Sequence, residues 1–232
     1  MASIVLATGW SPYDISKATD LNFNNSPDII SSLMMERLSA LNGQNNIKIT
    51  RPSDGREPDT IVFVQCAGSR DENHLPYCSG VCCSASLKQA LHTSEQNPGS
   101  KIIIFYIDLR VSGRNEAFLD RVKDNSQIEL IKGKVGKIVI DPVSGSLIID
   151  AEDIMSGSKL STRADLVVLA SGIVPNPVGI NQLTPGENGF FEQGRLEEGI
   201  YAVGCAKKPQ DVSSSLKDAT GAALKAIQSV NY

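Results

Sequence analysis

The chain has 232 residues, of which 41% are hydrophobic and 21% charged, a balance typical of a globular protein with one large or two small domains. Its formal net charge of −4 gives no electrostatic footprint for nucleic acid or for an anionic membrane, so the expected partners are proteins and small molecules. No apolar run approaches the roughly 18 residues that span a bilayer, and the start has no signal-peptide pattern, which predicts a cytoplasmic protein without direct membrane insertion.

Short β-branched runs alternate with helical stretches along most of the chain. In chain order, we predict a strand over 3–9, a helix over 28–41, a strand over 60–66, a helix over 84–96, a strand over 101–108, a helix over 115–125, an antiparallel meander over 128–153, strands over 164–172 and 199–205, and a helix over 213–228. Apolar runs of this length suit strands buried on both faces of a parallel sheet. The meander differs, because Gly-rich and "DPVSG" turns split it into three short β runs. The predicted class is α/β with Rossmann-like units and a small antiparallel β meander.

Four of the five cysteines follow the strand predicted over 60–66, with the spacing C-x11-C-x3-C-C: Cys66, Cys78, Cys82 and Cys83. Thiolate sets of four suit an iron-sulfur cluster or structural zinc, and a [4Fe-4S] cluster needs one protein ligand for each iron. Zinc sites favour paired C-x2-4-C knuckles, which this spacing lacks. A redox dithiol and unligated core cysteines are the other open interpretations. The two histidines, His74 and His92, are expected to be locally hydrogen-bonded or solvent-facing side chains.

The position of these cysteines favours a metal centre. A nucleotide-binding Rossmann unit carries G-x-G-x-x-G after its first strand, where the backbone approaches the pyrophosphate. This chain has the cysteine-rich loop instead, followed by a helix whose N-terminus favours an anionic thiolate cluster. Asp108, where an NAD-binding unit would carry its ribose-binding acid, is therefore predicted to be a turn residue. Arg70, Asp71 and Glu72 form a charged loop and are expected to make structural salt bridges.

Two predicted strands end alike, with "LATG" at 6–9 and "LASG" at 169–172. In folds resembling the flavin-dependent disulfide reductases, such endings mark where the chain leaves the flavin domain and where it returns. The resemblance implies three parts: residues 1–57 as part of the FAD-binding domain with a crossover helix, 58–170 as an inserted NAD(P)-like domain carrying the cysteine-rich loop, and 171–232 as the C-terminal part of the FAD-binding domain.

The segment at 51–91, which contains "VQCAGSRDENHLPYCSGVCC", closely resembles the core of the A subunits of heterodisulfide reductase and of the quinone-interacting membrane-bound oxidoreductase complex. The upstream "ISSLMMERLSA" and the downstream "ASGIVPNP" and "YAVGCAKKPQDVSSSLKDATGAAL" match as well. The resemblance implies a thioredoxin-reductase-like electron-transfer flavoprotein of sulfur or energy metabolism, with a [4Fe-4S] cluster on Cys66, Cys78, Cys82 and Cys83 that exchanges electrons with FAD. It also implies partner subunits of such a complex, through which the protein would associate with the inner membrane, and a homodimer is a further expectation.

The resemblance also assigns residues around the flavin. The cofactor-binding candidates are Thr8, Gly9, Ser171, Gly172, Gly204, Cys205, Asp211, Val212 and Ser213. Backbone N–H groups of the last three would face the flavin pyrimidine ring, although Asp211 or Ser213 also fits a helix N-cap. Lys88 is the near-flavin catalytic candidate, with a solvated lysine as its alternative.

This chain departs from the family pattern in two places. Gly80 replaces a basic residue in the cysteine loop, which is expected to lower the cluster potential slightly. The G-x-G-x-x-G of the FAD ADP site would precede residue 1, so we expect the chain to be part of a longer protein and not to retain FAD fully by itself. Two alternative functions stay open: a non-redox interaction subunit stabilised by zinc, and an NAD(P)H-dependent disulfide reductase using Cys78 and Cys82.

Overall fold

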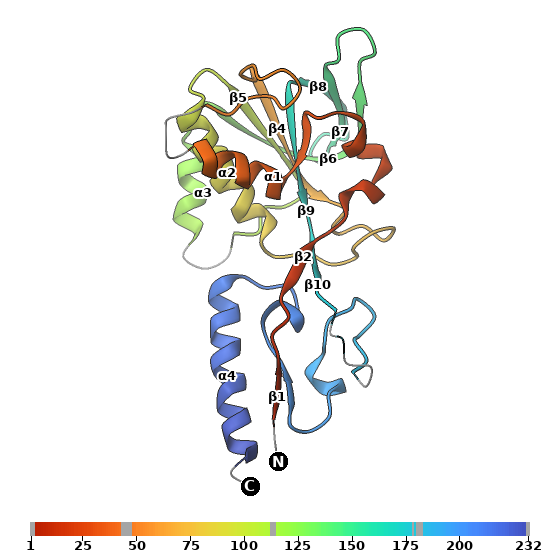
Figure 1. Cartoon of the computed structure of the whole chain (residues 1–232). Helices are drawn as coiled ribbons and strands as arrows, with labels where there is room; N and C mark the ends of the chain where they lie inside the picture. The colour runs from red at the N-terminus through yellow and green to blue at the C-terminus, as the bar shows by residue number, and fades with distance from the viewer. Residues whose placement is uncertain (1–2, 43–47, 112–114, 178, 180–182, 231–232) are drawn as a thin grey trace. The chain divides into compact units, whose positions relative to one another are not determined.

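The computed structural model describes residues 3–42, 48–111, 115–177, 179 and 183–230, and the contacts of the chain divide it into two compact units (Figure 1). The first unit comprises Met1–Tyr13, Tyr77–Val81 and Gly172–Tyr232, and the second comprises Asp14–Pro76 and Cys82–Ser171. The described residues between 14 and 57 therefore belong to the second unit. The sequence-based assignment of residues 1–57 to the FAD-binding domain, with a boundary at residue 57, stays a prediction.

The second unit is built on a seven-stranded sheet. In spatial order its strands are β3 (Ile29–Ser31), β9 (Leu166–Ser171), β4 (Thr60–Ala67), β5 (Lys101–Tyr106), β6 (Ile128–Ile140), β7 (Leu147–Asp153) and β8 (Lys159–Ala164). The strands from β3 to β6 run parallel, whereas β6, β7 and β8 form an antiparallel meander. The predicted α/β class, with a parallel sheet and a small meander, is confirmed.

Three helices cover one face of this sheet: α1 (Ser32–Asn42), α2 (Cys82–Gln96) and α3 (Glu116–Lys123) (Figure 1). Met35 of α1, Leu87 of α2 and Val122 of α3 all belong to one apolar cluster with Phe63 of β4 and Ile104 of β5. All five of these side chains are fully buried. Each buried side chain of this size contributes about 1.5–3 kcal/mol, so the cluster fixes the β4–α2–β5 unit that carries the cysteines.

The segment before β3 contains three short 3-10 turns, η1 (Ile15–Lys17), η2 (Thr19–Leu21) and η3 (Phe23–Asn25). Asn22 lies in the left-handed region between the last two turns and donates from Nδ2 to the carbonyl oxygen of Ile138 at 2.7 Å. This bond ties the segment to β6.

Two predicted helix starts differ from the structure. The helix predicted from residue 28 begins at Ser32, because Ile29 and Ile30 extend into β3 and pair with Val167 and Val168 of β9. Both isoleucines are buried, and β-branched side chains favour a strand in such a place. The second predicted helix begins at Cys82 instead of residue 84, which places two cysteines in its first turn.

The predicted turn within the first part of the meander is wrong, because β6 continues through it as one 13-residue strand. Its register with β7 shifts between Val135 and Lys137, the mark of a β-bulge. Gly133 is a glycine for reasons of space, since a Cβ there would lie 2.8 Å from the carbonyl oxygen of Glu152.

We therefore expect Gly133→Ala to lower the free energy of unfolding by about 1–3 kcal/mol, since the added methyl would force β6 and β7 apart. Chemical denaturation measures this. Gly136→Ala is the matched control in the same strand, because its Cβ would have the carbonyl oxygen of Asp150 as its nearest neighbour, at 4.0 Å. If both variants lost the same free energy of unfolding, the cause would be the strand propensity of alanine, and not a clash between the added methyl group and β7.

The first unit contains two small strand pairs and one long helix. β1 (Ile4–Leu6) runs parallel to β11 (Ile200–Ala202), and β2 (Trp10–Pro12) runs antiparallel to β10 (Ile173–Pro175). The helix α4 (Val212–Val230) packs against β1 and β11 (Figure 1). None of the helices in the described ranges is both long enough and apolar enough to cross a membrane.

Candidate metal centre

Three of the four predicted cluster ligands lie at one edge of the parallel sheet. Cys66 is near the carboxyl end of β4, and Cys82 and Cys83 open α2, which follows β4 in the chain. The Sγ of Cys82 donates to the carbonyl oxygen of Ser171 at the end of β9, at 3.4 Å. The Sγ of Cys83 contacts the carbonyl oxygen of Asp108, just after β5, at 3.9 Å. Because β9 and β5 flank β4, Cys66 and the first turn of α2 lie at the carboxyl ends of three neighbouring strands.

Cys66 has an unusual backbone. Its φ of 56° lies in the left-handed region, which non-glycine residues seldom adopt, and the pairing of β4 with β9 shifts register between Val64 and Ala67. Such bulges bend a strand and redirect a side chain, and they are common beside functional sites. The bend falls on the residue that the sequence marks as the first cysteine ligand.

Cys78 belongs to the segment Tyr77–Val81, which packs with the first unit. Tyr77 donates from its hydroxyl to the carbonyl oxygen of Ile173 at 2.9 Å, and its ring meets Phe190 edge-on, with centroids 5.2 Å apart. The N–H of Gly80 donates to the Sγ of Cys78 at 3.4 Å. Gly80 has a φ of 72°, so this position suits glycine better than the basic residue of the family pattern.

The donor chemistry of these residues fits an iron-sulfur cluster. None of the cysteines forms a disulfide, and four thiols supply the soft, anionic ligands that such a cluster needs. Chain connectivity keeps the Cα atoms of Cys78 and Cys82 within about 14 Å of each other, because so few residues lie between them. Among the residues that the structure describes, no three His, Cys, Asp or Glu side chains form a ready-made metal-binding group.

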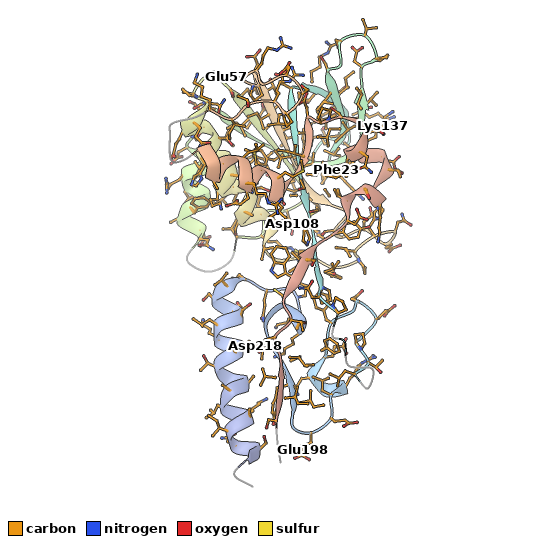
Figure 2. All side chains as sticks on the ribbon, in the orientation of Figure 1. Phe23, Glu57, Asp108, Lys137, Glu198 and Asp218 are labelled. Carbon is orange, nitrogen blue, oxygen red and sulfur yellow. The ribbon has the colours of Figure 1, made fainter. Side chains whose placement is uncertain are left out.

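The charged residues around this edge form ion pairs. Arg70 pairs with Asp108, which also accepts from Arg110 at 2.9 Å, and Lys134 lies 3.7 Å from Asp71. The salt bridges predicted for Arg70 and Asp71 are confirmed, whereas Glu72 has no ion pair within the described residues. Figure 2 shows Asp108 beyond the end of β5, which agrees with its interpretation as a turn residue.

Lys88, the near-flavin candidate, forms an ion pair with Glu36 of α1. Gln89 also donates to Glu36, from Nε2 to Oε2 at 2.9 Å. Burial alone would raise the pKa of Glu36, but the hydrogen bonds from Gln89 and Lys88 outweigh it and lower the pKa. The ammonium of Lys88 thus joins α1 to α2, and its role at a flavin stays a prediction.

Thr8, Gly9 and Gly172 lie in the first unit, and Ser171 ends β9 in the second. Gly9 has a φ of 72°, and its carbonyl oxygen accepts from the N–H of Asn176 at 3.1 Å. Thr8 donates from Oγ1 to the carbonyl oxygen of the same asparagine at 3.3 Å. The turn after β1 is therefore held beside the chain that follows β10.

The remaining flavin candidates lie around the start of α4. Gly204 has a φ of 60°, and the buried Cys205 donates from Sγ to the carbonyl oxygen of Gln210 at 3.4 Å. Asp211 accepts from the N–H of Ser214 at 2.7 Å, directly before the helix begins at Val212. Asp211 is thus an N-cap, as one of the two interpretations predicts, and the hydrogen bonds from Ser214 lower its pKa.

Sequence reasoning missed Asp218, which organises this region (Figure 2). Its carboxylate accepts from the N–H of Gly204 at 3.0 Å, from Lys207 at 2.7 Å and from Gln210 at 3.3 Å. Burial raises the pKa of Asp218, but these hydrogen bonds outweigh the burial and lower the pKa below its usual 3.8. No motif marked this residue, because its partners come from a loop of irregular backbone.

A lowered pKa in the folded state means that Asp218 adds stability above its unfolded pKa of about 3.9, and that this stability is lost as the pH falls through the folded value. We expect Asp218→Asn to lower the free energy of unfolding by about 1 kcal/mol at neutral pH, because the carboxylate loses charge-assisted bonds. The variant should also lose less stability than the wild type between about pH 6 and pH 3. Thermal unfolding at both pH values measures this, with Asp20→Asn, an exposed aspartate, as the control.

The comparisons with solved structures define the class of fold. Thioredoxin reductase from Lactococcus lactis matches with a TM-score of 0.60 at 16% identity, over 98% of this chain and 66% of that chain. Thioredoxin reductase from T. acidophilum matches with a TM-score of 0.61 at 14% identity, over 99% of this chain and 66% of that chain. The chain therefore has a thioredoxin-reductase-like, FAD/NAD(P)-binding Rossmann-like fold, as predicted.

No family model matches the chain, but curated proteins do. It is 32% identical over 241 residues to an iron-sulfur A subunit of the CoB–CoM heterodisulfide reductase of Methanopyrus kandleri, covering 97% of this chain and 37% of the relative. It is 34% identical over 264 residues to a protein of Archaeoglobus profundus named as similar to the A subunit of heterodisulfide reductase, covering 98% and 37%. The chain is thus homologous to the A subunits of heterodisulfide reductases over almost its whole length, which confirms the resemblance, and it spans about 37% of the length of these relatives.

Proposed function

We propose that this chain is an oxidoreductase segment that transfers electrons between FAD and a [4Fe-4S] cluster held by Cys66, Cys78, Cys82 and Cys83. The placement of Cys66, Cys82 and Cys83 at the carboxyl edge of β9, β4 and β5 carries the proposal. In open α/β sheets this edge is where cofactors bind. The name of the Methanopyrus kandleri relative, an iron-sulfur subunit, supports iron as the metal.

The residues of the chain would prepare the site in several ways. The first turn of α2 carries two of the thiols, and the backbone N–H groups of a helix N-terminus favour thiolate over thiol. The N–H of Gly80 already donates to the Sγ of Cys78, which stabilises negative charge on that sulfur. When bound, the cluster would supply one-electron transfer, and FAD would supply conversion between one-electron and two-electron steps.

We propose FAD contacts for the residues that the sequence singled out. The turn after β1, with Thr8 and Gly9, and the chain at Ser171 and Gly172 would provide small residues for close approach. The N-terminus of α4, capped by Asp211, would place backbone N–H groups toward a reduced, anionic flavin ring. In the same proposal Gly204 and Cys205 pack beside FAD.

The partners in this proposal are the other subunits of a heterodisulfide-reductase-like or quinone-interacting complex, together with a second copy of this chain. Relatives are named as A subunits of such reductases, including that of the H(2):CoB-CoM heterodisulfide,ferredoxin reductase of Methanothermobacter marburgensis. The place of action in this proposal is the cytoplasm, with any link to the inner membrane made through those subunits.

Anaerobic purification followed by iron, acid-labile sulfide, zinc and flavin analysis tests the proposal. We expect about four irons and four sulfides for each chain, the content of one [4Fe-4S] cluster. A colourless protein with one tightly bound zinc would contradict the proposal and support the zinc-stabilised interaction subunit. A metal-free protein that oxidises NAD(P)H with a disulfide substrate would contradict it in favour of a disulfide reductase using Cys78 and Cys82.

A further inference from the structure

Gln65 is a buried residue beside the cysteines whose side-chain amide has no hydrogen-bond partner. The residue is 6% exposed, and neither Nε2 nor Oε1 reaches a partner within the described part of the chain. Three other buried polar atoms share this state, Ser86 Oγ, Gln89 Oε1 and Gln96 Oε1, but Gln65 alone among the described residues has two such atoms. Such a group costs a factor of about ten or more in the folding equilibrium.

The position of Gln65 places this amide near the candidate cluster. It precedes Cys66 in β4, and Phe63, two residues earlier, packs in the apolar cluster with Leu87 and Ala90 of α2. Side chains two apart on a regular strand share a face, and the left-handed backbone begins only at Cys66, so Gln65 is expected to face α2 as Phe63 does. The first turn of that helix carries Cys82 and Cys83.

Ser86 gives a second observation of the same kind. It lies one turn after Cys82 on α2 and is fully buried, and its hydroxyl also lacks a partner within the described residues. Folded proteins contain few buried polar atoms without a hydrogen-bond partner, and a bound group that supplies the partner is one explanation for such an atom. Two unpaired polar side chains, on β4 and on α2, thus accompany the cysteines at this end of the unit.

We propose that Gln65 is a positioning residue of the cluster site, whose Nε2–H donates a hydrogen bond to a sulfur of the bound cluster. This inference rests on the proposed function. Cluster and cysteine sulfurs carry negative charge and accept N–H donors, and such bonds favour the reduced, more negative state. The amide would then raise the reduction potential of the cluster, at a cost to the stability of the metal-free chain.

The variant Gln65→Leu separates these two effects. In the metal-free protein, we expect the variant to be more stable than the wild type, by about tenfold in the unfolding equilibrium constant, because an unpaired buried amide is removed. In the anaerobically reconstituted protein, we expect a shift of the potential to more negative values. Urea denaturation measures the first effect, and a redox titration followed by electron paramagnetic resonance measures the second.

Gln127→Leu is the matched control, because the Nε2 of Gln127 donates to the carbonyl oxygens of Asn97 and Ser100, at 3.2 and 3.0 Å. This variant should lose stability and leave the potential unchanged. Gln65→Met offers a second side chain of similar length if leucine packs badly, and the same two shifts are expected.

Each result decides the inference. If both metal-free Gln65 variants are less stable than the wild type, the amide has partners within the protein, and the proposal is overturned. An unchanged potential in a loaded variant would overturn it as well. If the wild type itself binds no iron, the proposed function is wrong. If the wild type binds iron and the variant has the same potential, only the role of Gln65 is wrong, so the two failures can be told apart.

Discussion

Replacing Cys82 with serine is expected to abolish the proposed [4Fe-4S] cluster. The substitution keeps a small polar side chain that can still donate to the carbonyl oxygen of Ser171, so the first turn of α2 should remain folded. It removes one of the four thiolates that the cluster requires, and a hydroxyl is a poor ligand for iron in such sites. Iron and sulfide content after anaerobic reconstitution should fall from about four of each to near zero.

Cys205 provides the control. It is a buried cysteine whose Sγ donates to the carbonyl oxygen of Gln210, and it lies outside the proposed ligand set. Cys205→Ser should keep the iron content of the wild type. If Cys82→Ser also kept a full cluster, the assignment of this thiol as a ligand would be wrong.

Asp28→Ala is expected to cause a large loss of stability at a place far from the cysteines in the sequence. The carboxylate of Asp28, 5% exposed, accepts from the guanidinium of Arg51 at 2.9 Å and from the hydroxyl and N–H of Ser53, at 2.6 and 3.0 Å. Removing it leaves Arg51 largely buried with Asp54 as its remaining carboxylate, 3.6 Å away. Breaking a buried pair costs about 3–5 kcal/mol, so urea denaturation should show a loss of about 3 kcal/mol.

Glu57→Ala is the matched control for this prediction. Glu57, labelled in Figure 2, pairs with Lys48 at 2.8 Å. About half of each of these two side chains is exposed to solvent. An exposed pair contributes about 0–1 kcal/mol, so this variant should stay close to the wild type. If both variants lost a similar free energy of unfolding, burial of Asp28 would not be what makes its ion pair with Arg51 strong.

Hydrophobic pattern alone located most of the second unit. The runs at 60–66, 101–108 and 164–172 became β4, β5 and β9, because fully apolar segments of this length are stable only when both faces are covered. Four strands were not predicted: β2, β3 and β10, and also β8, which lies beyond the meander predicted over 128–153. The first three have only three residues each, and pairing with a distant strand, which local sequence does not encode, decides their conformation.

The candidate site was predictable to a similar degree. Cysteine spacing and the family resemblance singled out the four thiols. The left-handed backbone of Cys66 could not be predicted from the sequence, because cysteine seldom adopts this conformation. Gln65 and Asp218 were missed because their significance depends on burial and on partners in other elements. A polar residue at the end of an otherwise apolar strand was the one available signal for Gln65.

The order in which the strands of the second unit pair has a consequence for how this unit folds. The strands of the meander β6–β7–β8 are neighbours in sequence, whereas β3 pairs with β9, which lies far from it along the chain. Closing a long chain segment costs more entropy than closing a hairpin, so local pairings form faster than distant ones. We expect the meander to nucleate early and the edge strand β3 to dock late, which makes the closure of that last parallel ladder the slow kinetic step.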